Sequence, residues 1–106
     1  MTLLILLVCA LLEVGGDALM RKGMHASGMG RVSLVAAALA VLGSYGWIVN
    51  LPPWQFSRLL GVYVVLFFVV AQVVGVTAFG DRLTPAMLAG GALIVSGGAV
   101  MAFAAR

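Results

Sequence analysis

Four long apolar stretches follow one another along the chain, and short segments rich in glycine, proline and charged residues separate them. The stretches cover about residues 2–20, 32–50, 59–79 and 85–104. Each is close to the roughly 20 residues that an α-helix needs to cross the hydrocarbon core of a bilayer. The pattern therefore predicts an all-α membrane protein with four transmembrane helices.

The segments between these stretches carry signals that end helices. The first stretch stops at Arg21–Lys22, and the following segment, 23–30, is rich in glycine. Pro52–Pro53 ends the second stretch, because proline lacks the backbone N–H and clashes with the preceding turn. The third break, 80–84, is so short that its flanking helices must form a tight hairpin, and Pro85 suits the first turn of the last helix.

Composition supports the membrane assignment and limits what else the chain can contain. Of its 106 residues, 64% are hydrophobic and only 8% are charged, whereas soluble domains normally carry about 25% charged residues. So few charges could not cover a water-facing surface, and four spans leave no room for a soluble domain. We therefore expect a single four-helix domain over residues 1–106.

The formal charge of +3 bears on orientation in the membrane and gives no indication of nucleic-acid binding, because the six basic residues form no patch. Basic residues at the ends of spans are topology determinants. Four lie in the first and third loops and two on the opposite side: Arg21, Lys22, Arg31 and Arg82 against Arg58 and Arg106. This small bias favours termini outside the cytoplasm and is compatible with insertion in both orientations.

Enzyme chemistry finds no support in the sequence. No nucleophile and base are paired, and no group of metal-ligating residues is present; the single histidine, His25, lies in a glycine-rich loop. The single cysteine, Cys9, lies inside an apolar run, where it fits a small membrane-buried filler. We expect no catalytic residue, no metal and no cofactor.

Glu13 is the residue that most strongly indicates a function. It lies about two thirds of the way along the first stretch, where an ionised carboxylate costs about 3 kcal/mol on insertion scales. Such a group must be protonated, paired or turned to an aqueous cavity, and desolvation favours its neutral form. A carboxylate in that position can bind a proton or an organic cation in turn. The alternative is a neutral glutamic acid that hydrogen-bonds between helices.

Asp17 follows Glu13 by four residues and therefore shares its helical face. If both side chains faced one cavity, their titrations would be coupled, which makes Asp17 a possible second carboxylate. Alternatively Asp17 reaches towards the membrane interface and pairs with Arg21, again four residues on.

Polar and aromatic residues of the second and third stretches are candidates for lining a cavity, because aromatic faces attract organic cations. The candidates are Ser44, Tyr45, Trp47 and Tyr63. The aromatic ones fit an interfacial belt as well, which is the favoured interpretation for Trp54. The last stretch is instead dense in small residues, namely Gly90, Gly91, Ser96, Gly97 and Gly98, which suit close helix–helix association.

These residues together resemble the small multidrug resistance family of the drug/metabolite transporter superfamily, over nearly the whole chain. The segment Leu12-Glu13-Val14-x-Gly16 is similar to the family's essential-glutamate helix, and Phe79-Gly80-Asp81-Arg82-Leu83 to its hairpin loop. The segment Gly90-x-x-Leu93-Ile94-x-x-Gly97 is similar to the dimerisation motif of its fourth helix. Two features depart from the family. Helix 3 lacks its paired glycines and keeps only Tyr63 as an aromatic near its tryptophan position, and Asp17 stands where the family more often has a small or hydroxyl residue. The segment from Pro53 to Val64 is closer to the YnfA-type branch.

The resemblance implies an antiparallel homodimer of two oppositely inserted copies in the bacterial inner membrane. Their two Glu13 carboxylates would face a shared cavity, with Gly16 among its lining residues, and would exchange protons for quaternary ammonium, guanidinium-like or similar cations. Gly90, Leu93, Ile94 and Gly97 would form the dimer contact. The competing hypothesis is an accessory or hetero-dimeric subunit, such as a subunit of a lipid-carrier flippase that pairs with a paralogue.

Overall fold

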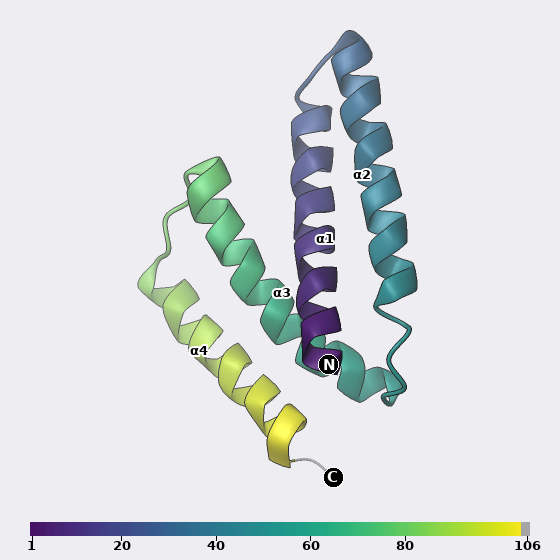
Figure 1. Ribbon diagram of the computed structural model, residues 1–106. Coiled ribbons are helices and arrows are strands. Elements are labelled where there is room, and N and C mark those ends of the chain that lie inside the picture. Colours follow the sequence, from purple (N-terminus) through teal and green to yellow (C-terminus); the bar gives the residue numbers. More distant parts are fainter. Residues whose placement is uncertain (105–106) are drawn as a thin grey trace. The chain divides into compact units, whose positions relative to one another are not determined.

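The computed structural model describes residues 1–104, and within them the chain is helical with short connections (Figure 1). Helix α1 spans Thr2–Met24, α2 Gly28–Ile48, α3 Phe56–Phe79 and α4 Pro85–Ala99, and a π-helical turn, η1, continues α4 over Val100–Ala104. Arg106, which counts towards the charge balance between the two sides of the membrane, lies outside the described residues.

All four helices are long and apolar enough to cross a membrane, when α4 is taken together with the described part of its π-helical continuation. The expectation of an all-α protein with four spans is therefore confirmed, and the chain is a multi-pass membrane protein. The chain also divides into two compact units that meet between Pro52 and Pro53. We call them the first hairpin (α1 and α2) and the second hairpin (α3 and α4).

The helices of the first hairpin extend further into their connecting loop than the sequence pattern predicts. Helix α1 continues through Arg21 and Lys22 to Met24, because cations in the last turn of a helix interact favourably with its dipole. Gly28 begins α2 with a φ of 61°, a left-handed conformation that glycine adopts without a steric penalty. The loop is closed by the Nδ1 of His25, which donates to the Arg21 carbonyl at 2.8 Å.

Two glycines of α1 determine how closely the helices of the first hairpin approach. A Cβ atom at Gly16 would lie 2.7 Å from side-chain atoms of Leu42, and one at Gly23 would lie 2.9 Å from Val35. Both glycines are buried. Small residues at such points let helix backbones approach closely, which is the usual basis of helix association in a bilayer.

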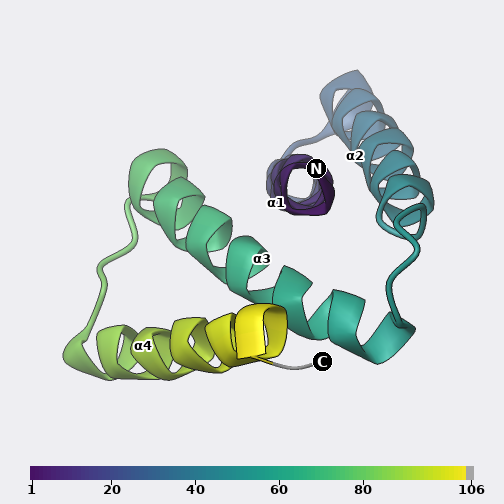
Figure 2. The same ribbon diagram turned by 60° about the horizontal axis from the view of Figure 1, so that its bottom comes forward.

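In the second hairpin the glycines that allow close packing lie on both helices. The ring of Phe68 lies 2.7 Å from a Cβ placed at Gly91, and the side chain of Val65 fills the position that a Cβ would take at Gly98. Gly61 of α3 makes room for the sulfur of Met101. The view in Figure 2 shows α3 and α4 separating towards their connecting loop and approaching each other near the end of α4.

The tight loop between α3 and α4 is held by its backbone. Gly80 ends α3 with a φ of 68°, and its N–H donates to the Gly75 carbonyl. The N–H of Asp81 reaches the same carbonyl at 2.9 Å, and the missing side chain of Gly75 makes room for the Asp81 carboxylate. Gly75 therefore fixes the start of the loop, because its carbonyl accepts both N–H groups and its lack of a side chain leaves room for Asp81.

The other end of this loop is a helix cap that can be tested directly. The Thr84 hydroxyl accepts the N–H of Met87 at 3.2 Å, and Pro85 occupies the first turn of α4. We expect Thr84→Ala to destabilise the second hairpin by about 1 kcal/mol, the usual value of such a cap. Thr84→Ser keeps the hydroxyl and should stay within a few tenths of a kcal/mol of the parent. Denaturation in detergent, followed by circular dichroism, measures both, and equal stabilities of the two variants would contradict the assigned cap.

Candidate functional site

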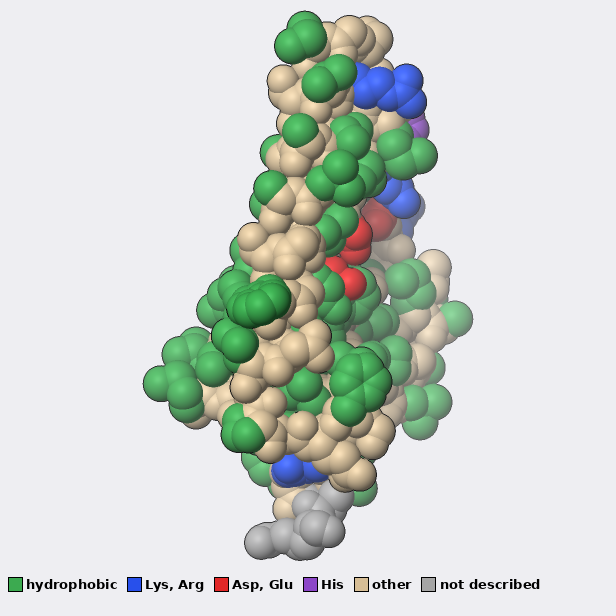
Figure 3. Space-filling model, turned by 90° about the vertical axis from the view of Figure 1, so that its right-hand side faces the viewer, with side chains coloured by type: hydrophobic (Ala, Val, Ile, Leu, Met, Phe, Trp, Pro, Cys, Tyr) green, Lys and Arg blue, Asp and Glu red, His purple; other side chains and the backbone are tan. Residues whose placement is uncertain are grey.

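Two carboxylates lie four residues apart on α1 and differ in exposure. Glu13 is half-buried in the single chain, whereas Asp17 is exposed. They share one face of the helix because 3.6 residues complete a turn. In the space-filling view of Figure 3, hydrophobic side chains predominate and acidic ones are few. A membrane span that carries two carboxylates on one face is exceptional and expensive to insert.

The register of the first hairpin shows which part of α2 accompanies Glu13. Gly16 lies against Leu42, and Gly23, seven residues on, lies against Val35, seven residues back, so the two helices run antiparallel in a constant register. By this register Glu13 lies at the level of Tyr45, which is half-buried. A phenol ring and a carboxyl group therefore occupy the same depth of the hairpin.

Gly16 contributes to this site through its position between the helices. It is buried and contacts Leu42 and Val41 of α2. It therefore brings α2 within close reach of α1, three residues from Glu13, and its own surface faces a neighbouring helix within the chain.

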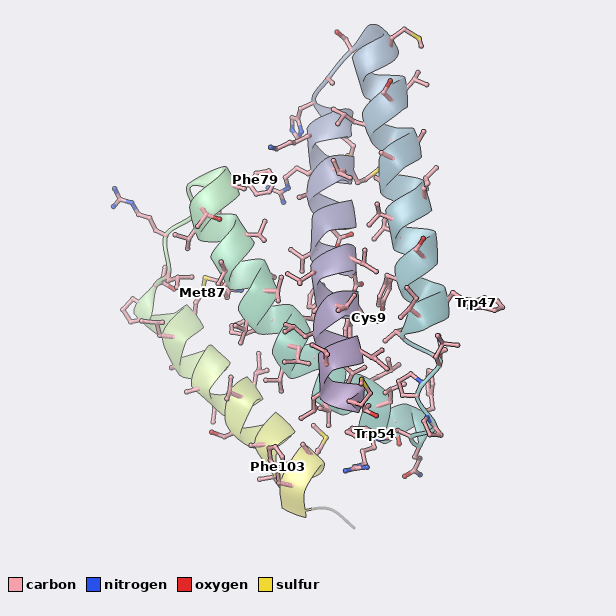
Figure 4. All side chains as sticks on the ribbon, in the orientation of Figure 1. Cys9, Trp47, Trp54, Phe79, Met87 and Phe103 are labelled. Carbon is pink, nitrogen blue, oxygen red and sulfur yellow. The ribbon has the colours of Figure 1, made fainter. Side chains whose placement is uncertain are left out.

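The other two candidate residues of α2, Ser44 and Trp47, are exposed. Ser44 is exposed, and its hydroxyl donates to the Ala40 carbonyl of its own helix at 2.9 Å. Trp47 is 76% exposed and projects away from the first hairpin (Figure 4). An indole so exposed on a membrane helix faces lipid, a second protein copy or a bound ligand.

Tyr63 belongs to the second hairpin and is only 5% exposed. Its ring centre lies 6.2 Å from that of Phe67, one turn further along α3, at an interplanar angle of 41°. This is the separation and tilt at which aromatic pairs attract each other.

The glycines of the predicted dimerisation motif on α4 and the glycines next to them lie on different faces of the helix. Cβ atoms at Gly90 and Gly97 would meet nothing within 4 Å, Leu93 is 75% exposed and Ile94 is half-buried. The neighbouring glycines, Gly91 and Gly98, instead pack against α3. The motif residues Gly90, Leu93 and Gly97 thus leave a face of α4 open, while the glycines beside them hold the hairpin together.

The second hairpin also contains an apolar groove that the sequence pattern did not indicate. It has a volume of about 350 Å³ and is lined from α3, the loop and α4 by Phe68, Gln72, Leu83, Met87, Leu88, Gly91, Ala92 and Val95. This volume is in the range of ligand pockets. Its signal in the sequence is weak, because only Gln72 stands out there among apolar neighbours.

Among residues 1–104 no three histidine, cysteine, aspartate or glutamate side chains come together in a way that could hold a metal ion. Comparison of the chain with protein-family models, with curated proteins and with solved structures gives no match in any of the three.

Proposed function

We propose that this protein is a proton-coupled antiporter that exports small organic cations across the bacterial inner membrane, as the resemblance to the small multidrug resistance family implies. The observation that carries the proposal is Glu13, a half-buried carboxylate inside a membrane span. An ionisable residue at that depth is costly, and such residues mark substrate and proton pathways in transporters.

The chemistry of exchange follows from a single carboxyl group with two exclusive ligands. In the neutral form Glu13 carries a proton and has no charge with which to attract a cation. Loss of the proton creates the negative charge that holds the cation, since attraction is strong where water is scarce. A transporter that changes its access only when Glu13 is occupied would therefore exchange cations for protons.

The proposed active form is an antiparallel homodimer in which the Glu13 residues of two copies face one cavity. Two observations support this form. In one copy Glu13 is only half-buried, so a second copy could complete its enclosure. The open face of α4, with Gly90 and Gly97, also offers the kind of small-residue surface on which membrane helices associate. A heterodimer with a paralogue would use the same face.

Aromatic residues at the level of the carboxylate suit an organic cation. Tyr45 lies at the depth of Glu13 in the first hairpin, and Trp47 is exposed two residues further on. The faces of such rings attract cations by about 2 kcal/mol when the pair is desolvated. Asp17 adds negative charge nearer the end of α1 and would draw cations and protons towards Glu13.

The proposal predicts coupled movement of cations and protons. In liposomes that contain the purified protein and a pH-sensitive dye, an outward gradient of a quaternary ammonium or guanidinium compound should drive protons inwards, even when no pH gradient is imposed. Ionophore-treated liposomes and protein-free liposomes serve as controls. Cation flux that leaves the internal pH unchanged at every gradient would contradict proton coupling.

The apolar groove of the second hairpin favours a second candidate, a subunit that handles a lipid-linked carrier. An anionic carrier headgroup would need a basic partner within the membrane, whereas the described basic residues lie in the loops or in the terminal turns of the helices. The two candidates differ in the same liposome assay, because a flippase subunit should translocate a fluorescent polyprenyl phosphate and should leave protons unmoved when cations are added.

A further inference from the structure

Arg58, in the first turn of α3, makes an unusual set of contacts at the open end of the second hairpin. Its Nε donates to the Met101 carbonyl at 3.2 Å, and its Nη2 donates to the Ala102 carbonyl at 3.1 Å. The same guanidinium lies 4.2 Å from the centre of the Trp54 ring. One side chain thus connects the segment before α3, the start of α3 and η1.

The carbonyls that Arg58 engages belong to η1, the last turn of the chain that the structure describes. A backbone carbonyl at membrane depth needs a hydrogen-bond donor, and a guanidinium is a strong one. The turn that carries both carbonyls, η1, is π-helical, and π-turns are rare and often functional. A cation is also favoured at this end of a helix by the helix dipole.

Packing beside Arg58 brings the two helices together at the same place. Gly61, nearly one turn further along α3, accommodates the sulfur of Met101, the residue whose carbonyl accepts from Arg58. Trp54, labelled in Figure 4, is half-buried beside the start of α3. The start of α3 and η1 are therefore connected by a forked hydrogen bond and an apolar contact, while the cation–π contact with Trp54 holds the Arg58 guanidinium from the α3 side.

We propose that Arg58 clamps η1, the continuation of α4, to the start of α3, so that the second hairpin is closed at both ends. The loop joins one end covalently, and Arg58 joins the other. The two helices of this hairpin then move as one body whenever the protein changes conformation. The clamp is independent of the function proposed above.

A basic residue near the end of a span could instead serve to bind the headgroup of an anionic lipid. The two roles differ in what they require. The clamp works through backbone carbonyls of the same chain and is independent of lipid charge. A headgroup contact disappears in a bilayer that contains only zwitterionic lipid.

Distances between spin labels in the full chain test the clamp. In a Cys9→Ala background, Ser57→Cys and Phe103→Cys place labels on exposed positions at the clamped end, and Thr77→Cys with Met87→Cys places them at the loop end. Excess unlabelled protein removes distances between copies. We expect Arg58→Gln to widen the distance distribution at the clamped end by about twofold or more, as a helix end frays once its contacts are lost. The loop-end distribution should stay unchanged.

Arg31→Gln is the matched control, because it removes the same charge from an exposed residue in the first turn of α2 and should leave both distributions unchanged. Arg58→Lys keeps the charge but loses the planar fork, so its clamped-end width should lie between those of the parent and Arg58→Gln. It also answers the question if Arg58→Gln fails to insert.

Three results would overturn the proposal. The first is a clamped-end distribution of parental width in Arg58→Gln or Arg58→Lys. The second is equal widening at both ends, which would mean a general loss of structure. The third is a distribution that Arg58→Gln widens in bilayers containing anionic lipid but leaves unchanged in pure phosphatidylcholine. That result would assign Arg58 to the binding of a lipid headgroup.

Discussion

Glu13→Gln is expected to abolish coupled transport while leaving the helices inserted. Glutamine has nearly the shape of the protonated acid, yet it can neither release a proton nor present a negative charge to a cation. Loss of one partner of a desolvated charge pair costs about 3 kcal/mol or more, which corresponds to a fall in cation affinity of about 100-fold. Proton release on addition of candidate cations to the detergent-solubilised protein measures cation binding and loss of the proton at once.

Asp17→Asn is the control that separates the two carboxylates of α1. It removes an equal charge from the same helical face, at a position that is exposed where Glu13 is half-buried. We expect it to keep cation-induced proton release, with an affinity lowered by less than about tenfold, in keeping with a solvent-screened charge. Normal coupled transport by Glu13→Gln, or its loss in Asp17→Asn alone, would assign the function to a different group.

The second large effect, a loss of stability, is expected when leucine replaces one of two adjacent glycines of α4. The position of a Cβ at Gly98 is already filled by the side chain of Val65, so Gly98→Leu must push α4 away from α3. Overpacking of this kind typically costs about 1 to 3 kcal/mol and occasionally more. We expect Gly98→Leu to reach or exceed the upper end of that range, because four carbon atoms enter a closed contact. Denaturation of the protein in micelles, followed by circular dichroism, measures the loss.

Gly97→Leu is the matched control, one residue earlier on the same helix. A Cβ at Gly97 would meet nothing within 4 Å, so the same side chain can point away from α3. Its effect should stay within about 0.5 kcal/mol, the usual range for a substitution at an open position. The measurement is made at a low protein-to-detergent ratio, which keeps the chain monomeric and so excludes any effect on association. Equal destabilisation by the two variants would contradict the assigned faces of α4.

The number and type of the helices could be predicted from the sequence because the bilayer imposes a simple rule. A span needs about 20 apolar residues and satisfies its backbone internally, so hydrophobicity and length identify it without knowledge of its neighbours. The helix ends were less predictable. The glycine-rich segment 23–30 predicts a loop, yet α1 continues to Met24 and Gly28 already begins α2.

The candidate site was predictable only as far as local pattern determines it. Glu13 and Asp17 lie on one face of α1 because helix geometry alone puts them there. The level of Tyr45 depends on the register between two helices, which in turn depends on where Gly16 and Gly23 allow contact. A single helix does not contain that information.

The glycines of α4 illustrate the same limit. Gly90, Gly91, Gly97 and Gly98 are chemically equal in the sequence, and adjacent ones lie about 100° apart around the helix. Which of them packs within the chain depends on the position of α3. The contacts of Gly91 with Phe68 and of Gly98 with Val65 resolve the question, and they leave Gly90 and Gly97 open.

The compactness of the first hairpin has a consequence for biosynthesis. Residues 1–52 form a unit of their own, joined by a loop of only three residues between α1 and α2. Synthesis from the N-terminus completes this pair of helices before the second hairpin has emerged from the ribosome. The newly made α1 can therefore enter the lipid with α2 already beside it. The Glu13 carboxyl group then enters the membrane at the same depth as Tyr45 of α2.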